Sequence, residues 1–251
     1  KTLLNLTSPM YNVPLSLKFD KAVRIDTALL ESLESSHTNE TLSSTVISNI
    51  RCLQIKNCDE ILEQDFRKLV SLLPQLSIII LKKCAWVNDD VIEYMVKKVG
   101  SKISYLEFED INITDNSLHF IGGKCDDLKT ITVKHCPMIG KKGFAELKKL
   151  NIQILNIHHC SVCEDDSIDG VLSNSGQLAR LSFLNCPRLT DQIAYGLFEC
   201  QVSWGRKRNE KSSSLLSFEV SGNPNISHNA LLYLSTSSPN IQTLDLSDCD
   251  S

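Results

Sequence analysis

The 251-residue sequence contains no apolar run approaching the roughly 18 residues that a membrane-spanning helix needs. It also lacks a phosphate-binding Gly-rich loop, a G-x-S-x-G nucleophile elbow and an H-E-x-x-H zinc motif. The formal net charge is only -4, so no overall basic field attracts nucleic acid. From these absences we expect no membrane insertion, no nucleic-acid binding, no resident metal or cofactor, and no enzymatic activity.

The first residues, KTLLNLTSPMYNVP, lack both an initiator Met and the hydrophobic segment and cleavage site of a secretory signal. We therefore expect a fragment whose two ends lack their native capping repeats, which in repeat proteins shield the terminal faces.

Ten cysteines are present, a number that in a secreted chain suggests disulfides. Six of them, however, share one position of a repeat, where equivalent side chains stack as a ladder of small buried residues instead of pairing. We therefore expect free thiols and a reducing compartment, the cytoplasm or the nucleus. Four N-x-S/T triplets would favour secretion, but such triplets arise easily by chance.

The repeat itself reads L-x-x-L-x-L-x-x-C, followed by a turn and an amphipathic segment, and it occurs about eight times. Its second apolar position recurs at intervals of 24 to 27 residues, with one interval of 37 residues. The second apolar residues of the copies are Leu53, Ile79, Leu106, Ile131, Leu155, Leu181, Phe218 and Leu244. The L-x-L alternation predicts a short strand with one buried face, and parallel strands at this interval require a crossover helix. We therefore predict an α/β leucine-rich repeat solenoid.

Helical spacing follows the turns, and Asn88, Thr190 and Ser227 stand where helix N-caps are expected. We predict a single leucine-rich repeat domain over residues 1–251. It comprises clear repeats over 50–251, a degenerate repeat and a polar loop over 13–49, and a Ser-rich, basic loop insertion at about 201–214, which accounts for the long interval. In the degenerate repeat we expect Leu15 and Leu17 on a strand and a helix over 21–34, followed by the loop at 35–45.

The segments CPRLTDQIAYGLFEC, CAWVNDDVIEYMVKK and NPNISHNALLYLSTSSPNIQTLDLSDC resemble the cysteine-containing repeats of F-box/leucine-rich-repeat proteins. The resemblance covers about residues 50–249. It implies a right-handed arch with parallel strands on the concave face and helices on the convex face. In that family the repeats hold a protein substrate for a cullin-RING ubiquitin ligase, and an F-box helps to dock the ligase subunits. Residues 1–50 contain no F-box pattern, so the alternative is an F-box-free scaffold, regulator or assembly factor.

The strand residues that alternate with the buried positions should face the arch, where stacked repeats form an extended binding surface. Tyr and Arg on such a surface are residue types enriched at binding hot spots. The residues that we expect to bind a protein partner are Ile78, Ile80, Lys82, Tyr105, Glu107, Glu109, Thr132, Lys134, Asn156, His158, Arg180, Ser182 and Leu184.

A less favoured alternative uses the cluster of His158, His159, Cys160 and Cys163 as a zinc or redox site, because C-x-x-C is a zinc half-site and a redox motif. Cys160 stands in the buried ladder register, and no second C-x-x-C or H-x-x-x-H supplies further ligands. His158 and His159 are adjacent on a strand and should point to opposite sides, whereas His135 and His159 occupy equivalent positions and should be neighbours.

Overall fold

The computed structural model describes residues 2–5, 15–21, 25, 30–31, 35, 49–174, 177–205 and 214–249. In this described part of the chain, ten strands form a single sheet in sequence order. The strands are β1 (Thr2–Asn5), β2 (Leu15–Asp20), β3 (Ile50–Lys56), β4 (Ile78–Lys82), β5 (Tyr105–Glu109), β6 (Thr130–Lys134), β7 (Ile154–His158), β8 (Arg180–Leu184), β9 (Ser217–Glu219) and β10 (Thr243–Asp245). All neighbours pair in parallel except β1, which pairs antiparallel to β2.

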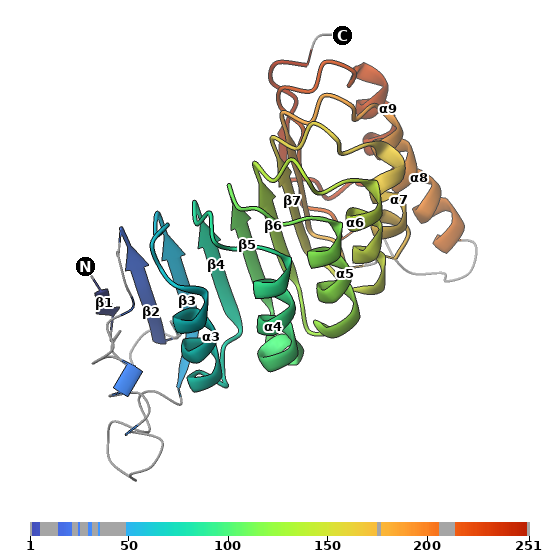
Figure 1. The fold of residues 1–251 in the computed structure, drawn as a ribbon. Coiled ribbons are helices and arrows are strands. Elements are labelled where there is room, and N and C mark those ends of the chain that lie inside the picture. The colour runs from blue at the N-terminus through green and yellow to red at the C-terminus, as the bar shows by residue number, and fades with distance from the viewer. Residues whose placement is uncertain are drawn as a thin grey trace.

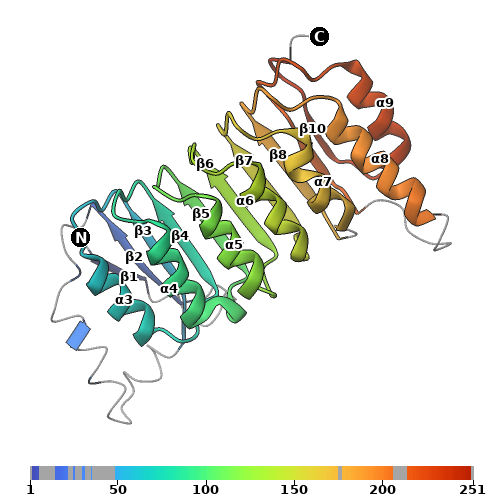
Figure 2. The same cartoon turned by 45° about the vertical axis from the view of Figure 1, so that its right-hand side comes forward.

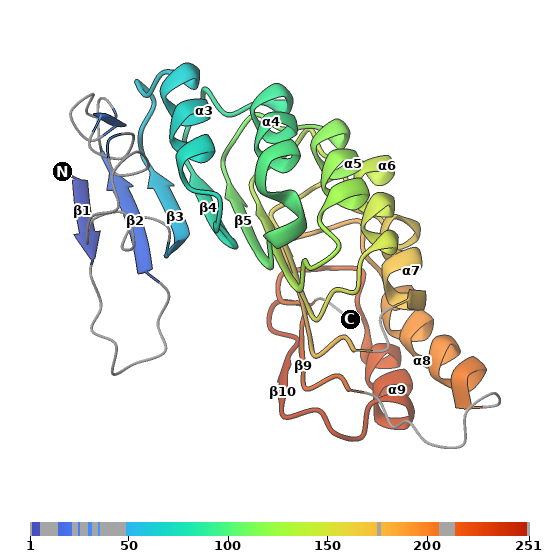
Figure 3. The same ribbon diagram turned by 90° about the horizontal axis from the view of Figure 1, so that it is seen from below.

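From β3 onward, helices follow the strands and cover one face of the sheet (Figure 1). They are α3 (Glu63–Leu72), α4 (Asp89–Val99), α5 (Asp115–Lys124), α6 (Lys141–Glu146), α7 (Asp165–Asn174), α8 (Gln192–Gly205) and α9 (His228–Ser237), with short 3-10 turns at Gly100–Lys102 and Leu147–Lys149. The helices follow one another in a single layer, as Figure 2 shows, and Figure 3 shows the chain bending into an arch with the helices outside. The expected α/β leucine-rich repeat solenoid is confirmed.

The repeats of β2 to β9 each supply two apolar residues from the strand or its end to one continuous core between the sheet and the helices, whereas Leu244 of β10, expected to be buried, is 46% exposed. Leu181 and Phe183 of β8 are fully buried, as are Leu155 and Ile157 of β7. Apolar residues of the helices close the core from the other side. Burial of a side chain of this size stabilises the fold by about 1.5–3 kcal/mol, so every strand contributes to holding its neighbours. In the described part of the chain, no helix has the length and apolar character required to cross a membrane.

The turn after each strand uses a residue with positive φ, directly before the ladder position. In the clear repeats these residues are Asn57, Lys83, Asp110, His135, His159, Asn185, Gly222 and Asp248, with φ between 50° and 72°. In the turns at Asn57 to Gly222 the backbone N–H of this residue donates to a carbonyl at the end of the next strand or just beyond it, as from Lys83 to Glu109 at 2.8 Å. The turns therefore bind successive repeats to each other. Left-handed backbone costs a non-glycine residue about 1–2 kcal/mol, which the inter-repeat bonds offset.

The ladder residue that follows is buried and bonds to the backbone of the turn. The thiols of Cys84 and Cys186 each donate to two carbonyl oxygens, one in their own repeat and one in the preceding strand. Burial raises the pKa of the Cys84 thiol to about 11. The nine cysteines whose side chains are described are all free thiols, and Cys249 alone among them is partly exposed. This agrees with the expected stack of unpaired thiols.

Asn223 takes the ladder position in the repeat of β9 and makes three bonds there. Its amide nitrogen donates to the carbonyl oxygens of Phe183 and Val220, both at 2.6 Å. Its side-chain oxygen accepts the backbone N–H of Cys186, also at 2.6 Å. An amide can donate and accept at once, so a single fully buried side chain joins two repeats.

A second series of contacts joins the helix starts. The expected N-caps are confirmed: the side chains of Asn88, Thr190 and Ser227 accept backbone N–H groups of their own first turns. Asp89 and Asp165 reach across to the next repeat. The carboxylate of Asp165, for example, accepts the N–H and hydroxyl of Thr190 at 2.9 and 2.7 Å. These carboxylates therefore hold the caps of neighbouring helices in place.

Several details differ from the sequence expectations. The antiparallel strand β1 was not expected, because it carries no repeat pattern. The segment 201–214 is not a loop throughout, since α8 continues to Gly205. In α9, Leu231 and Leu232 are 39% and 62% exposed, and only Leu234 of this leucine group packs into the core. The strand expected at Leu15 and Leu17 is confirmed as β2. In the helix expected over 21–34, Lys21 and Ile25 are not helical, whereas Leu30 and Glu31 are, and Ser35, expected in the loop, is helical too. The rest of that helix, residues 36–45 of the loop and residues 206–213 lie outside the described residues.

Replacement of Asn223 by alanine should lower the free energy of unfolding by about 2–4 kcal/mol, because one N–H and two C=O groups lose their buried partner. Chemical denaturation measures the change. Asn225→Ala is the matched control: it removes one exposed bond to Pro187 and should cost less than about 1 kcal/mol. Equal losses in the two variants would contradict a special role for the ladder position.

Replacement of Lys83 by glycine should raise the free energy of unfolding by about 0.5–1 kcal/mol, since glycine adopts φ near 51° without a Cβ clash. The side chain of Lys83 is exposed, so little packing is lost. Lys83→Ala removes the same ammonium group but keeps the Cβ, and it should give no stabilisation. Thermal melts of the two variants side by side test this difference.

Candidate functional site on the concave face

The side chains that face the arch form three rows, because the strands pair without a register shift from β3 onward. The first row contains Cys52, Ile78, Tyr105, Thr130, Ile154 and Arg180. The middle row contains Gln54, Ile80, Glu107, Thr132, Asn156, Ser182 and Glu219. The third row contains Lys56, Lys82, Glu109, Lys134, His158 and Leu184. The structure therefore places every residue expected to bind a partner on one face, and it adds Cys52, Gln54, Lys56, Thr130, Ile154 and Glu219 to them.

The rows differ in how far they reach solvent. In the middle row Glu107, Thr132 and Ser182 are only 8%, 3% and 1% exposed. By contrast, Ile78, Ile80 and Tyr105 are partly exposed, and the side chain of Arg180 is 48% exposed. Glu107, Thr132 and Ser182 thus form a buried floor, whereas Gln54, Ile80 and Asn156 of the same row are partly exposed, as are most residues of the first and third rows.

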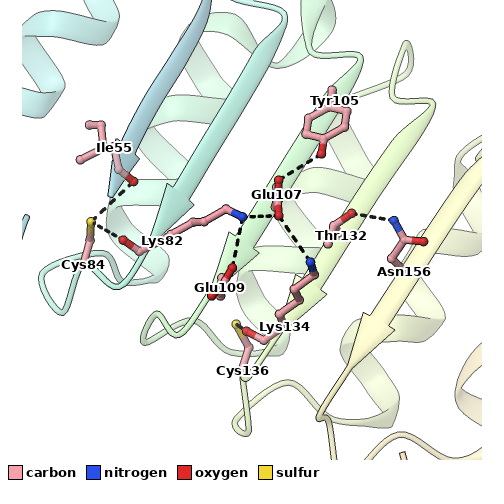
Figure 4. A network of polar contacts seen from close by, with 10 residues as sticks. All are labelled: Ile55, Lys82, Cys84, Tyr105, Glu107, Glu109, Thr132, Lys134, Cys136 and Asn156. Atoms are coloured by element: carbon pink, nitrogen blue, oxygen red, sulfur yellow. Dashed lines mark hydrogen bonds and ion pairs between the residues drawn. The ribbon is translucent and has the colours of Figure 1, made fainter. Parts of the chain in front are cut away.

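Glu107 is the centre of one polar network (Figure 4). Its carboxylate accepts from Lys82 at 2.5 Å and from the hydroxyl of Tyr105 at 3.1 Å, and Lys134 lies 3.7 Å away. Lys82 also pairs with Glu109 at 3.1 Å. Burial disfavours the charge on Glu107, but the hydrogen bond and charge of Lys82 outweigh burial and hold the carboxyl pKa below its usual value. Burial, with the nearby Glu107 charge, raises the pKa of Tyr105 to about 12.

A second network lies on β7, β8 and β9. The Nε2 atom of His158 is 2.9 Å from the hydroxyl of Ser182, which donates to Glu219 at 3.3 Å. Arg180 and Ser217 also donate to Glu219, at 2.6 and 2.9 Å. Although serine, histidine and glutamate meet here, the serine stands between the other two and is buried. A nucleophile would instead need an exposed hydroxyl with the histidine between it and the carboxylate.

Asn156 lies between the two networks and donates its amide N–H to Thr132 at 2.9 Å. Its side-chain oxygen is buried and has no hydrogen-bond donor. Figure 4 shows this oxygen pointing away from Thr132. Such an unpaired acceptor costs about 1–3 kcal/mol, so Asn156 is the least satisfied polar group of the face.

The histidine and cysteine cluster does not assemble into a reactive centre. His135 and His159 stack with ring centroids 4.1 Å apart, as their equivalent positions predict, while His158 bonds to Ser182 on the concave face. Cys160 and Cys163 are fully buried, and burial raises the pKa of both thiols, to about 11 for Cys160. Reactive thiols require the opposite shift. Among the residues that the structure describes, no three metal-ligating side chains are grouped to hold an ion.

His158 should make stability depend on pH. Burial, followed by the charge of Lys134, lowers the pKa of its imidazole from 6.5 to about 4. His159 and Arg180 lower it further, and Glu219 opposes them. Between these two values the unfolded chain binds the proton and the folded chain does not, so stability falls as the pH is lowered through this window. The expected loss is on the order of 2 kcal/mol.

Urea denaturation at several pH values between about 7 and 4 would measure this dependence. His158→Asn should flatten the curve relative to the unmodified chain, because the titrating imidazole is gone. His228→Gln removes an exposed histidine at the start of α9 and should keep the original slope. A slope unaffected by His158→Asn would contradict the assignment.

Comparison with known proteins gives information on the fold alone. No family model and no curated protein matches the sequence. A chain of the crystal structure of the yeast Rad7 and Elc1 complex is similar, with a TM-score of 0.52 and 15% identity over 90% of this chain and 65% of that chain. An internalin from Listeria monocytogenes gives a TM-score of 0.40 and 12% identity over 82% of this chain and 63% of that chain. The chain thus spans less than two thirds of the length of either structure, and it shares the architecture of leucine-rich repeat proteins.

Proposed function

We propose that this chain is a protein-binding module, not an enzyme, and that its partner lies on the concave face. The observation that carries the proposal is the combination of a fixed polar floor with large, partly exposed apolar side chains above it, namely Ile78, Ile80 and Tyr105. Aromatic and aliphatic anchors on a rigid surface are typical of binding hot spots. Interface residues on ordered strands also lose little further conformational freedom on binding.

We further propose that the module is the substrate-recognition part of an F-box-type cullin-RING ubiquitin ligase receptor. The resemblance of the repeats to the F-box/leucine-rich-repeat class supports this role, and so does the similar fold found in the crystal structure of the Rad7 and Elc1 complex. An F-box-free scaffold, regulator or assembly factor is the alternative, since the fold alone does not define the chemistry of the partner. The nine free thiols support a reducing compartment, as in the cytoplasm or nucleus.

The test is affinity purification from cells followed by mass spectrometry, with three versions of the chain. Ile80→Asp and Tyr105→Ala alter the concave face and should each abolish or strongly weaken recovery of specific partners. Leu232→Asp is the control, because it places the same charge on an exposed leucine of α9 on the other side of the molecule. Circular dichroism melts establish that all three variants fold.

The outcomes separate the hypotheses. Partners lost from both concave variants and retained by Leu232→Asp would support binding on this face. An unchanged set of partners in all variants would exclude the concave face. Cullin-complex subunits among the recovered proteins would favour the ligase receptor, and their consistent absence from an otherwise specific set would favour the scaffold.

A further inference from the structure

The first row forms a mainly apolar stripe that crosses the strands, in which Ile78, Tyr105 and Ile154 are partly exposed, Cys52 is buried and Thr130 is the polar member. From β3 to β7 it contains Cys52, Ile78, Tyr105, Thr130 and Ile154, and register pairing makes each residue the direct neighbour of the next. Arg180, bound to Glu219, closes the stripe at β8. Figure 4 shows Tyr105 near the start of β5 and Glu109 near its end, so apolar and charged side chains occupy opposite edges of the face. The surface is thus amphipathic across its width.

The spacing of this stripe matches a helix better than an extended segment. Neighbouring strands lie about 4.8 Å apart, so four intervals from β3 to β7 span roughly 19 Å. An α-helix advances about 5.4 Å per turn and presents an apolar side chain once per turn. Four turns cover about 22 Å, close to the stripe. An extended segment advances about 6.7 Å between side chains on one face, and four such steps overshoot to about 27 Å.

The opposite edge carries positive charge that the fold does not neutralise. In β3 to β6 the third row has three lysines, Lys56, Lys82 and Lys134, against one glutamate, Glu109. Glu107 in the middle row is the other carboxylate, and it is already bound by Lys82 with Lys134 nearby. Even with both carboxylates counted, one ammonium group remains in excess. On β2 the same two rows add Lys18 beside Gln54 and Asp20 beside Lys56, whose charges cancel, so the excess of one is unchanged. Lys56 has no ion pair among the described residues. A complementary partner would bring carboxylates to this edge.

We propose that the concave face binds an amphipathic α-helix of about four turns, which lies across β3 to β7. Its apolar side chains contact the first row, and acidic side chains along one flank contact Lys56 and Lys134. This inference deepens the proposed binding function and rests on it. Glu107 and Thr132, the buried residues of the middle row on β5 and β6, form the floor beneath the helix. Ile80 of the same row is partly exposed and contacts the apolar side of the helix as well.

Fluorescence anisotropy with designed peptides tests the proposal. The probe is a labelled peptide of about 18 residues with leucine at helical i, i+3, i+4 and i+7 spacing and glutamate along one flank. Three controls keep its length: lysine in place of glutamate, the same residues with the leucines redistributed around the helix, and strict leucine–glutamate alternation. The acidic amphipathic peptide should bind at least about tenfold more tightly than any control.

Variants locate the binding. Ile78→Asp in the first row should lower the affinity for the probe by about tenfold or more. The double variant Lys56→Glu, Lys134→Glu should do the same, whereas Leu232→Asp on α9 should leave the affinity unchanged. In the double variant the lysine-bearing peptide should become the better ligand. That reversal of preference cannot come from misfolding, so it keeps the charge assignment testable even if the variant is less stable.

Several results would overturn the inference. The first is that the acidic amphipathic peptide does not bind at concentrations up to about 1 mM. The second is that the alternating or basic peptide binds the unmodified chain more tightly. The third is that the concave variants bind the probe with unchanged affinity. If purification shows partners that depend on Ile80 while the helical probe fails, the binding function stands and the helical ligand is wrong. If both fail, the concave face itself is not the binding surface.

Discussion

The structure depends on satisfying the backbone polar groups in the turn that follows each strand. These groups lie close to the core and away from water, where an unpaired N–H or C=O is costly. The chain meets this constraint by three devices that recur along the repeats. A left-handed residue directs its N–H to the next repeat, a thiol or amide at the ladder position binds the carbonyls, and a carboxylate holds the following helix cap. Each device joins neighbouring repeats, so no repeat is complete without the next one.

The aligned rows of the concave face follow from the same turns. Because each turn is bound to its neighbour in the same way, the strands keep a constant register from β3 to β10. Side chains of one row are therefore always lateral neighbours and can bond across strands, as Lys82 does with Glu107 and Asn156 with Thr132. Short side chains in the middle row become buried between longer ones on either side. The alternation of residues along the strands suggests that all these side chains are exposed, whereas the structure packs some of them into a floor.

The fold was predictable from the sequence because the apolar period of 24 to 27 residues is dictated by the core. Burial leaves a strong pattern, and the cysteine register and the caps at Asn88, Thr190 and Ser227 followed from it. The turn conformation left a weaker signal. Glycine, asparagine, aspartate and histidine are all enriched in that backbone, so no single residue type marks the position, and Lys83 shows no such preference at all. The antiparallel strand β1 gave no signal in the sequence, because its pairing with β2 lies outside the repeat pattern.

For the site, the alternation of residues along each strand predicted which side chains face the arch, but not how deeply each one is buried. It placed Glu107, Thr132 and Ser182 on the concave face correctly, yet their burial depends on the lengths of side chains one strand away, which no pattern within a single repeat encodes. The pairing of Lys82 with two glutamates likewise depends on the curvature and register of adjacent strands.

The polar groups of the concave floor are mostly bonded to each other before any partner arrives. Desolvating Glu107 or Ser182 on binding therefore adds little cost, because both are already buried and hydrogen-bonded. A partner gains equally little from them, since their bonding capacity is largely used. The favourable contributions must then come from groups that still contact water, which are the apolar side chains of the first row, Ile80 of the middle row and the lysines of the third. His158 adds no positive charge to the face, because burial lowers the pKa of its imidazole to about 4. A charged imidazole would otherwise lie near Lys134. The buried floor thus supplies rigidity, while affinity and selectivity arise from the accessible side chains around it.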